Sequence, residues 1–426
     1  MRRMLTRAGS VCVAGMAALA CLLIGTQPAF ADAGGKIDSG DTAWVLASSA
    51  MVMFMTPGLG LFYAGMVRRK NALATILQSF IMCGLAAVIW VLWGYSLAFG
   101  TDHWGIIGSF EYLGLMGVGS DPINGGTIPH QAFMIFQAMF AVITPALITG
   151  AFAERITFKA FFIFMIVWLT VVYAPIAHWV WGSGGWLFEL GALDFAGGTV
   201  VHICSGVAAL CCALVIGRRK GYGHEEFKPH NLTMTLTGTA LLWFGWFGFN
   251  AGSALAANAT AVNAFVVTNT AAAAAALTWV IIEWLHRGEP TALGFASGAV
   301  AGLVAITPAS GFVGPMPALV LGVVVSGLCY LAIMMKTKLG YDDSLDVFGI
   351  HGVGGTWGAI ATGLFASAAI GSTNGLFFGN PALLGKQLVA IVSVMAYSFV
   401  VTFLILKAIS LFTPLRVAKD DEDTGL

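Results

Sequence analysis

Long apolar stretches alternate with short polar segments along most of the chain. Apolar stretches of about 20 residues are typical of helices that cross a lipid bilayer. The pattern predicts eleven such helices, at residues 43–66, 73–99, 131–152, 160–181, 197–217, 232–250, 261–285, 291–307, 315–335, 347–370 and 387–412. We therefore expect an all-α polytopic membrane protein, with residues 32–413 forming its transmembrane domain.

The first 31 residues have a different pattern. Arginines at positions 2, 3 and 7 precede an apolar run over residues 11–25, and the segment Ala29-Phe30-Ala31, with small residues at its two ends, follows it. A basic start, a short apolar run and small residues at a cleavage site are typical of a secretory signal peptide. We expect residues 1–31 to be cleaved. The alternative is an uncleaved anchor, for which the apolar run is short.

Lysine and arginine are divided unevenly between the two sets of loops. Beyond the predicted signal, fifteen of these residues follow odd-numbered spans, and only Lys36 and Lys386 fall on the other side. Basic residues concentrate in cytoplasmic loops. The distribution therefore predicts an amino terminus outside and a short cytoplasmic tail at residues 414–426. An exported, cleaved amino terminus agrees with this orientation.

Short motifs recur five spans apart. The segment Asp194-Phe-Ala-Gly-Gly before His202 resembles Asp346-Val-Phe-Gly before His351, and residues 62–65 resemble residues 249–252. Because five is odd, the partners enter the membrane from opposite sides, as in transporters built from inverted repeats. We predict an inverted five-plus-five repeat, the first over about 43–217, the second over about 232–370, and an extra C-terminal helix at about 387–412.

Composition agrees with this fold class and excludes others. Hydrophobic residues make up 58% of the chain and charged residues 9%, which a water-soluble domain could not tolerate on its surface. The formal net charge is zero and no basic cluster resembles a nucleic-acid footprint, so nucleic acid is not expected as a partner. The cysteines beyond the predicted signal lie in apolar runs, which implies neither a disulfide framework nor a zinc site.

His202 and His351 lie deep inside predicted spans. A charged or titratable group in a span costs roughly 2.5–3.5 kcal/mol on insertion scales, so each histidine is a candidate functional residue. Either could be a core histidine bonded to a neighbouring helix, but matching positions in two facing repeats favour a shared central site. A metal site is the rival explanation, although two imidazoles without a nearby cysteine or carboxylate fall short of the usual ligand set.

A carboxylate precedes each histidine-bearing span. Asp194 lies near the predicted outer face and Asp346 near the inner face. A carboxylate in this position can accept the free N–H groups of the first helical turn, and we expect this capping role for Asp346. Asp194 could cap in the same way, or it could support a cation site from behind without contacting the solute.

Aromatic residues form the third group of candidates. They share one face of the third span or lie near the ends of the fourth and sixth. Tryptophans at span ends are usually interfacial anchors, whereas an aromatic cage with a hydroxyl can hold a small cation at about 0.5–2 kcal/mol per contact. Sequence alone leaves both explanations open. The candidates are Phe136, Phe140, Trp181, Trp246, Phe249 and Ser253.

With these residues the chain resembles the ammonium transporter/methylammonium permease/Rh family, most closely its bacterial ammonium transporters. The resemblance covers roughly residues 40–426 and rests on segments 136–155, 194–219, 228–253 and 346–355. It implies a homotrimer in the bacterial cytoplasmic (inner) membrane, with a pore between the two repeats of each subunit and the eleventh helix outside. It also implies transport rather than catalysis, with no cofactor and no bound metal.

The resemblance assigns roles by position in these motifs. Ammonium would be recruited at the outer face, lose its proton because desolvation lowers the pKa of an amine-type cation, and pass a hydrophobic pore as ammonia. The recruitment residues would be Phe140, Trp181, Ser253 and, as support, Asp194; the gate would be Phe140 and Phe249; the pore would be lined or supported by Phe136, His202, His351, Trp246 and Tyr173.

Partners and alternatives stay open at this point. The family implies docking of the PII signalling protein on the cytoplasmic face, which the short tail puts in question, and methylammonium is a second candidate substrate. The glycine-rich outer loop at residues 100–129 has no assigned role. The alternative functions are an ammonium sensor, a proton- or sodium-coupled transporter of another solute, and an intramembrane redox or metal enzyme.

Overall fold

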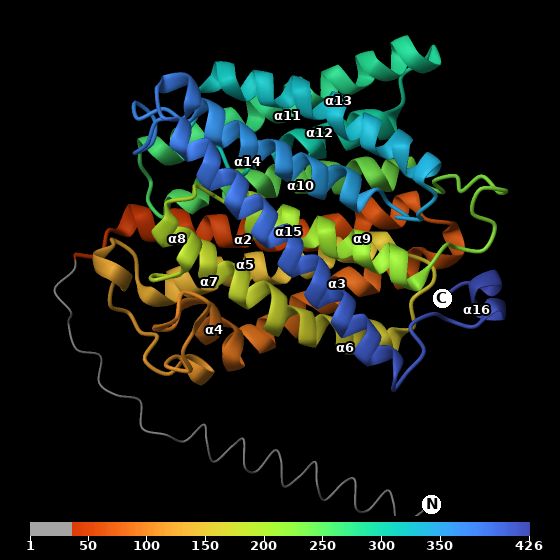
Figure 1. Cartoon of the computed structure of the whole chain (residues 1–426), viewed down its shortest axis with the longest axis horizontal. Coiled ribbons are helices and arrows are strands. Elements are labelled where there is room, and N and C mark those ends of the chain that lie inside the picture. Colours follow the sequence, from red (N-terminus) through yellow and green to blue (C-terminus); the bar gives the residue numbers. More distant parts are fainter. Residues whose placement is uncertain (1–35) are drawn as a thin grey trace, which may run out of the picture.

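A computed structural model describes residues 36–426, so the predicted signal peptide lies outside the described residues. Long helices lie side by side along one common direction and form a single bundle (Figure 1). The described chain begins at one end of this bundle and ends at the other.

The first half of the bundle is interrupted by π-helical turns, in which an N–H group bonds to the carbonyl five residues earlier. Two of these turns join shorter helices into continuous rods, and a third opens the last helix of this half. The helices are α2 (Ser39–Met66), α3 (Ala72–Ile89), α4 (Tyr95–Phe99), α5 (His130–Ile148), α6 (Phe158–Trp168), α7 (Ala174–Trp181), α8 (Trp186–Leu190) and α9 (Cys204–Ile216); the π-helical turns are η2 (Trp90–Gly94), η6 (Leu169–Tyr173) and η7 (Gly198–Ile203).

The second half also contains a π-helical turn, η9 (Phe348–Gly352), which opens its fifth long helix. The helices are α10 (Leu232–Ala251), α11 (Ala259–Arg287), α12 (Ala292–Ile306), α13 (Pro315–Leu339), α14 (Val353–Phe365), α15 (Pro381–Ser410) and the tail helix α16 (Lys419–Thr424). Short 3₁₀ turns occur at η1 (Arg69–Asn71), η3 (Leu113–Leu115), η4 (Ile123–Gly125), η5 (Thr149–Phe152), η8 (Gly252–Ala254) and η10 (Leu376–Phe378).

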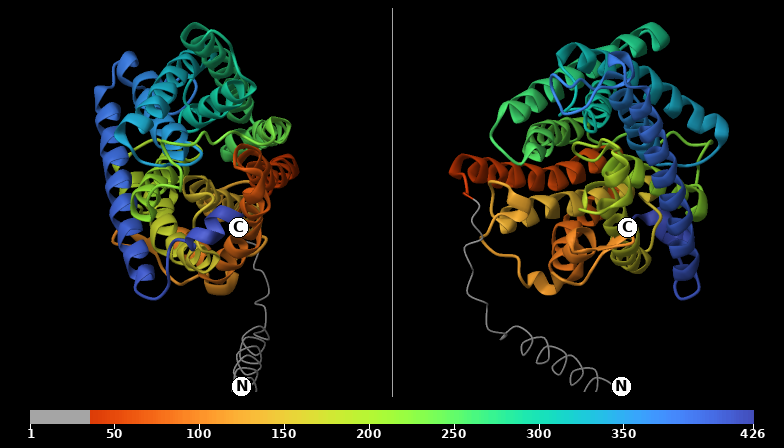
Figure 2. Two further views of the ribbon diagram at one scale, coloured as in Figure 1. Left: turned by 90° about the vertical axis from the view of Figure 1, so that its right-hand side faces the viewer. Right: turned by 60° about the vertical axis from the view of Figure 1, so that its left-hand side comes forward.

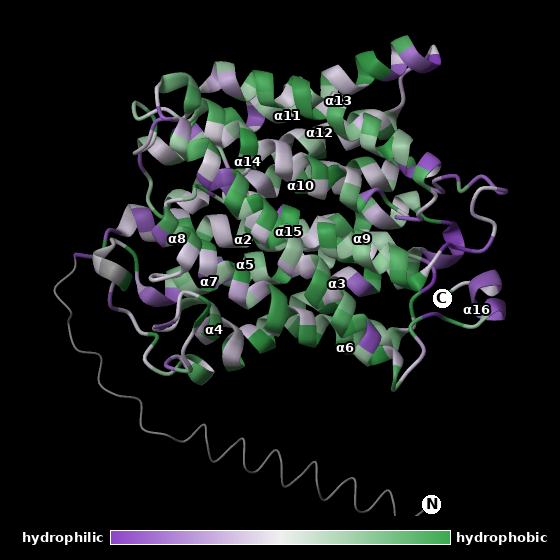
Figure 3. Cartoon of the chain, viewed as in Figure 1, coloured by the Kyte–Doolittle hydropathy of each residue, from purple (hydrophilic) through white to green (hydrophobic). Residues whose placement is uncertain are grey.

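Eight helical segments in the described part of the chain are long and apolar enough to cross a membrane, and α12 is a shorter apolar helix of 15 residues. Apolar residues cover the middle of the bundle and polar residues gather at its two ends (Figure 3). The protein is therefore a multi-pass, mostly helical membrane protein. Every predicted span contains a helix, but the number of eleven crossings and the orientation of the termini stay predictions.

Side chains at the helix starts explain several boundaries. A polar residue before the first turn accepts a backbone N–H group that has no partner within the helix. Such caps are provided by Asp38 for α2, Thr157 for α6, Asn231 for α10, Asn258 for α11 and Thr291 for α12.

α2 and α10, the first helices of the two predicted repeats, pack together along much of their length. Glycine permits this contact, because a Cβ atom at Gly238 would lie 2.4 Å from the backbone nitrogen of Phe62, and one at Gly65 would lie 2.5 Å from the carbonyl oxygen of Asn231. Small residues at such crossings let membrane helices approach closely. The two predicted repeats therefore meet backbone to backbone.

The loop at residues 100–129 carries the only strands in the described residues, the two-residue pair β1 (Asp102–His103) and β2 (Ile107–Gly108). An ion pair joins this loop to α7. The buried His178 ring places Nε2 2.8 Å from a carboxylate oxygen of Asp102 and Nδ1 2.9 Å from the carbonyl oxygen of Ala98. The loop is thus anchored close to Trp181.

α15 lies along the outer side of the bundle (Figure 2). It packs against α9 and α14, the helices that follow the two histidine-bearing turns. The buried hydroxyl of Ser398 donates to the carbonyl of Cys204 at 2.7 Å. This arrangement agrees with an extra helix that covers both predicted repeats from outside.

One end of the bundle holds a buried network of charged side chains. Arg219 forms a two-pronged ion pair with Asp342 at 2.8 and 2.9 Å, and Arg68 pairs with the buried Glu154 at 2.6 Å. Arg155 is fully buried and donates to the carbonyls of Ala151, Ala153, Gly217 and Asp342 and to the hydroxyl of Ser344. This network joins loops from both halves of the chain.

Candidate functional site

The two candidate histidines meet in the centre of the bundle. His202 lies in η7 and His351 in η9, so both occupy π-helical turns, which are frequent at functional sites. Their Nδ1 atoms are 3.2 Å apart, and the ring centroids are 5.2 Å apart at an angle of 24°. A hydrogen bond between two Nδ1 atoms requires one ring to donate and the other to accept.

Two glycines bring the histidine-bearing helices into backbone contact. Each lies four residues after a histidine, one turn further along the helix. A Cβ atom at Gly206 would lie 2.2 Å from the backbone nitrogen of Gly352, and one at Gly355 would lie 2.9 Å from the Cβ atom of His202. The distance between the two imidazoles therefore depends on the absence of side chains at these positions.

Both imidazoles are almost completely buried, with His202 1% and His351 4% exposed. Nε2 of His202 has no hydrogen-bond partner among the described residues. Buried polar atoms are nearly always satisfied, so such an atom beside a cavity marks a position where a polar molecule can bind. Among residues 36–426 no third histidine, cysteine or carboxylate joins the pair, which offers a metal ion two ligands where a structural zinc site has four.

A narrow cavity lies on each side of His351. The first contains both histidines and is otherwise lined almost entirely by apolar side chains, and the second extends toward Asp346. Phe62, Val300 and His351 line both cavities, so the two are neighbours. The first is lined by Met55, Leu59, Phe62, Ile143, Leu147, Val201, His202, Leu242, Trp246, Phe249, Val300 and His351, and the second by Phe62, Tyr63, Met66, Leu293, Ser297, Val300, Leu345, Asp346, Val347, Ile350 and His351.

Trp246 and Phe249 of α10 pack against the ring of His202. The Trp246 ring stacks on His202 at 5.4 Å and 23°, and its indole N–H donates to the hydroxyl of Thr307 at 2.9 Å. Phe249 lies 6.1 Å from the same imidazole. The orientation of His202 is therefore fixed by stacking and not only by its bond to His351.

Phe140 and Phe249 close one end of the first cavity. Their ring centroids are 4.4 Å apart and both side chains are buried, which leaves no space for a molecule between them. Phe136 contacts Phe140 from one side at 5.1 Å, and Trp181 contacts it from the other at 5.6 Å, both edge to face. The aromatic candidates, which lie in separate predicted spans, thus form one continuous series of rings.

Asp194 caps the first turn of η7. Its Oδ1 accepts N–H bonds from Gly197 and Gly198 at 2.8 and 2.6 Å, and its Oδ2 accepts them from Thr199 and Val200 at 2.7 and 3.3 Å. The Thr199 hydroxyl also bonds to Oδ2. Burial raises the pKa of Asp194, and the bonds from Thr199 and the glycine N–H groups oppose this shift. The sequence left open whether Asp194 caps the helix, and the geometry supports the capping role.

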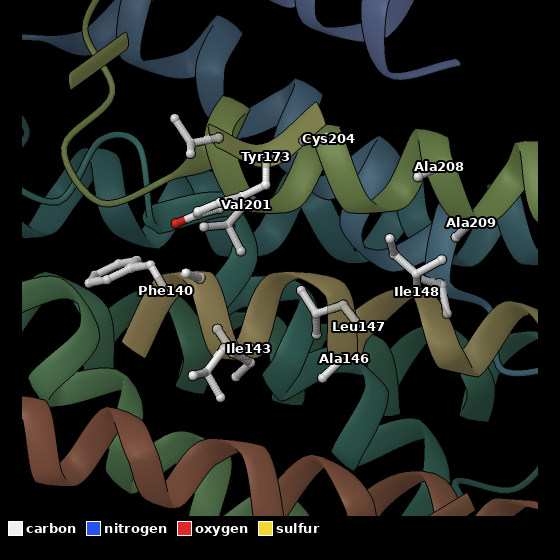
Figure 4. Packing of buried hydrophobic residues seen from close by; sticks show 14 of the residues in the cluster. Phe140, Ile143, Ala146, Leu147, Ile148, Tyr173, Val201, Cys204, Ala208 and Ala209 are labelled. Carbon is white, nitrogen blue, oxygen red and sulfur yellow. The ribbon is translucent and has the colours of Figure 1, made fainter. Parts of the chain in front are cut away.

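The remaining candidates lie around this series of rings. Trp181 is tied to the Asp194 turn by its indole N–H, which donates to the carbonyl of Asp194 at 2.9 Å. Ser253 follows Phe249 by one helical turn and donates to its carbonyl at 2.8 Å. Tyr173 lies in the layer between α9 and α5 (Figure 4) and packs against Trp90 at 6.2 Å. It is not among the residues that line the two cavities.

The capping prediction for Asp346 is wrong. Its backbone is left-handed, with φ 60°, and its carboxylate pairs with Lys336. The first turn of η9 is capped instead by Asp343, whose Oδ2 accepts the N–H of Phe348 at 2.7 Å. Burial raises the pKa of Asp343 to about 6, although Lys336 lowers it. Asp343 precedes His351 by eight residues, as Asp194 precedes His202, and this spacing was readable in the sequence.

A buried histidine pair, a largely apolar cavity beside a second one and a series of packed aromatic rings inside a bundle of membrane helices are typical of a membrane transport protein. Residues 43–426 match the model of the Ammonium Transporter Family, and the chain belongs to this family, which comprises transporters and not enzymes.

Individual relatives agree over nearly full length. The chain is 52% identical over 391 residues to the ammonium transporter of Bacillus subtilis, covering 91% of this chain and 96% of that protein. It is 38% identical to Candida albicans Mep2, with a TM-score of 0.86 and coverage of 91% of this chain and 88% of that one. A solved sensor Amt protein is 29% identical, with a TM-score of 0.85 and coverage of 91% and 96%.

Proposed function

We propose that this protein moves ammonium across a cytoplasmic membrane by recruiting the ion at the Trp181 end, removing its proton, and passing ammonia through the cavities around the histidine pair. The observation that carries the proposal is the buried pair itself. The two Nδ1 atoms face each other at 3.2 Å, and Nε2 of His202 has no protein partner in the described chain. That atom is available to a small molecule that forms hydrogen bonds.

The apolar cavity lining favours ammonia over the ion. Moving an intact ammonium ion into such surroundings costs on the order of tens of kcal/mol before compensation. Neutral ammonia avoids most of this penalty, and desolvation itself lowers the pKa of the ion. Potassium has no proton to lose. Deprotonation therefore provides a discrimination that ionic size alone does not.

Recruitment rests on the rings and the carboxylate at the closed end of the first cavity. Trp181 and Phe140 offer aromatic faces to a cation, with each contact worth about 0.5–2 kcal/mol, and the hydroxyl of Ser253 provides an oxygen ligand. All the hydrogen bonds that the Asp194 carboxylate accepts come from residues 197–200, at the start of η7. Asp194 therefore acts through its negative charge and by shaping the turn that holds Trp181, without direct contact with the solute.

The histidine pair offers ammonia a way through without carrying a charge. One N–H group is shared between the two Nδ1 atoms, so both rings are neutral and oriented. Trp246 holds the face of the His202 ring, and the Nε2 atoms of the pair accept or donate hydrogen bonds along the cavity. The released proton crosses in a separate step, for which we assign the histidine pair as the relay, so the pair is protonated only during that step.

The membrane arrangement completes the proposal. Two inverted five-helix repeats are supported by reciprocal packing, because η7 contacts α14 while η9 contacts α9. Eleven crossings, with the amino terminus outside, are supported by the gathering of Arg68, Arg155 and Arg219 in one network. The pattern of residues 1–31 adds a cleaved signal peptide to the proposal. By analogy with the family we include a homotrimer in a bacterial inner membrane, methylammonium as a second substrate and PII docking beside the tail.

The test replaces both histidines by leucine, with His286→Leu as a control, since His286 contacts Tyr330 and not the pore residues. Currents are recorded from purified protein in liposomes after an ammonium pulse, with potassium as the competing ion. We expect the double variant to lose the ammonium current or to admit potassium, and the control to behave as wild type. Selective, unchanged ammonium current in the double variant would refute the paired-histidine role.

A sensor is the second candidate, because the fold also matches a solved sensor Amt protein. A sensor binds ammonium and conducts little. The same recording separates the two functions: a wild-type protein that binds ammonium, measured by calorimetry, but gives no current would favour the sensor and exclude the transporter.

A further inference from the structure

The outer helix α15 contributes one buried amide to the pore region. Gln387 is 1% exposed. Its Oε1 accepts the N–H of Leu193 at 2.7 Å, and its Nε2 donates to the carbonyl of Leu193 at 2.8 Å and to that of Ala359 at 3.1 Å. These partners determine the orientation of the amide, because an N–H group must face its oxygen and carbonyls must face its nitrogen. Both amide hydrogens are used.

The bonds of Gln387 join the two histidine-bearing segments. Leu193 directly precedes Asp194, whose carboxylate caps the turn that carries His202. Ala359 lies in α14, which continues from the turn that carries His351. Gln387 therefore ties the capping turn of one predicted repeat to the pore helix of the other, from a helix that belongs to neither.

Apart from the bonds within its own turn, few other bonds tie the backbone around Asp194 to neighbouring segments. The Trp181 indole donates to the Asp194 carbonyl at 2.9 Å, and the N–H of Phe195 donates to the carbonyl of Pro308 at 3.2 Å. Only Gln387 bonds both backbone groups of one residue in this connection. A buried amide is costly unless it is fully bonded, and an apolar side chain would suffice if helix packing were its only role.

We propose that Gln387 is a positioning residue for the pore entrance: it sets the place of the Leu193–Asp194 backbone relative to α14, and thereby the place of the Asp194 carboxylate and of Trp181. The effect on transport rests on the function proposed above, whereas the effect on the turn does not.

The test variant is Gln387→Met, which keeps the length of the side chain and removes its donors and acceptor. The control is Thr402→Val, because the Thr402 hydroxyl accepts the buried indole N–H of Trp168 at 3.0 Å, also on α15 but away from the cavities. For Gln387→Met we expect the half-saturating ammonium concentration to rise roughly five- to thirtyfold, which corresponds to about 1–2 kcal/mol, with the maximal current changed less than about twofold. Thr402→Val should change neither.

A second readout needs no transport. Amide hydrogen exchange of the detergent-purified full chain should become faster in peptides covering residues 190–200 for Gln387→Met and stay as wild type for Thr402→Val. If Gln387→Met does not fold, Gln387→Asn, which is one methylene shorter, replaces it with the same expectation.

Three results would overturn the positioning role: unchanged exchange at residues 190–200, an unchanged half-saturating concentration in a protein that conducts, or equal shifts in both variants. A silent wild-type protein would refute the proposed transport and leave the exchange result to decide the role of Gln387.

Discussion

A methyl group at Gly206 tests the central geometry most directly. In Gly206→Ala the new Cβ atom would meet the backbone nitrogen of Gly352 at 2.2 Å. Real contacts of this kind stay above 3.0 Å, so the two backbones must separate by about 0.8 Å. The same movement lengthens the Nδ1 to Nδ1 distance from 3.2 Å to about 4.0 Å, which is beyond a hydrogen bond.

The cost follows from these distances. Overpacking of this size destabilises a protein by roughly 1–3 kcal/mol, which lowers the temperature of thermal unfolding in detergent. Loss of the shared hydrogen bond removes about 1 kcal/mol more from the arrangement of the pair. A change of that size in the barrier corresponds to roughly fivefold in rate, so we expect the ammonium-evoked current in liposomes to fall at least about fivefold.

The matched control is Gly327→Ala in α13, where a Cβ atom would have nothing within 4 Å. Alanine is the better helix former by about 0.5–1 kcal/mol, so this variant should unfold at the same or a higher temperature and conduct as wild type. If Gly206→Ala keeps the wild-type current and unfolding temperature, the added methyl group does not force the two histidine-bearing helices apart, and the reasoning fails.

Two further predictions concern buried charge. The pKa of Asp343 is about 6 in the folded protein against an ordinary 3.8, so between these pH values the folded state holds more protons than the unfolded state and its stability falls as pH rises. Relative to Asp343→Asn, the unfolding temperature of the wild-type protein should therefore decrease from pH 4 to pH 7. An increase would contradict the assignment. Arg155→Lys should destabilise the folded protein by roughly 2–4 kcal/mol, because one ammonium group cannot donate to five acceptors. The control Arg287→Lys, at an exposed position, should have little effect on stability. Equal changes in unfolding temperature in the two variants would refute the role of the network.

The hydrophobic pattern predicted the long helices well, because every predicted span contains a helix, and the predicted repeat placed His202 opposite His351. The π-helical turns that carry both histidines were not predictable, since they are defined by backbone bonds such as the one from the N–H of His202 to the carbonyl of Gly197, and a hydrophobic pattern does not distinguish these from α-helical bonds. Asp346 was misassigned because three acids precede η9, and the left-handed backbone of Asp346 turns its side chain to Lys336. That backbone conformation is uncommon for a residue other than glycine, although aspartate adopts it more often than most residues do.

Other parts of the site could not be predicted from the sequence, for different reasons. Tyr173 carries a hydroxyl in an apolar run, as a pore residue does, yet its ring packs against Trp90. Gln387 was visible as a polar residue in the last span, but its partner Leu193 lies 194 positions away, and sequence patterns do not identify contacts between such distant backbone groups.

The bonds of Arg155 also constrain the order in which parts of the protein fold during its synthesis. Its guanidinium bonds to the carbonyl of Asp342, which is made 187 residues later. At translation rates of about 5–20 residues per second, that delay is roughly 10–40 s. During this interval the arginine has its acceptors from the first half, the carbonyls of Ala151, Ala153 and Gly217, but lacks Asp342 and Ser344 from the second half. The first half of the bundle therefore cannot finish folding at this end until the loop before His351 has emerged, which makes closure of the network a late step in membrane insertion.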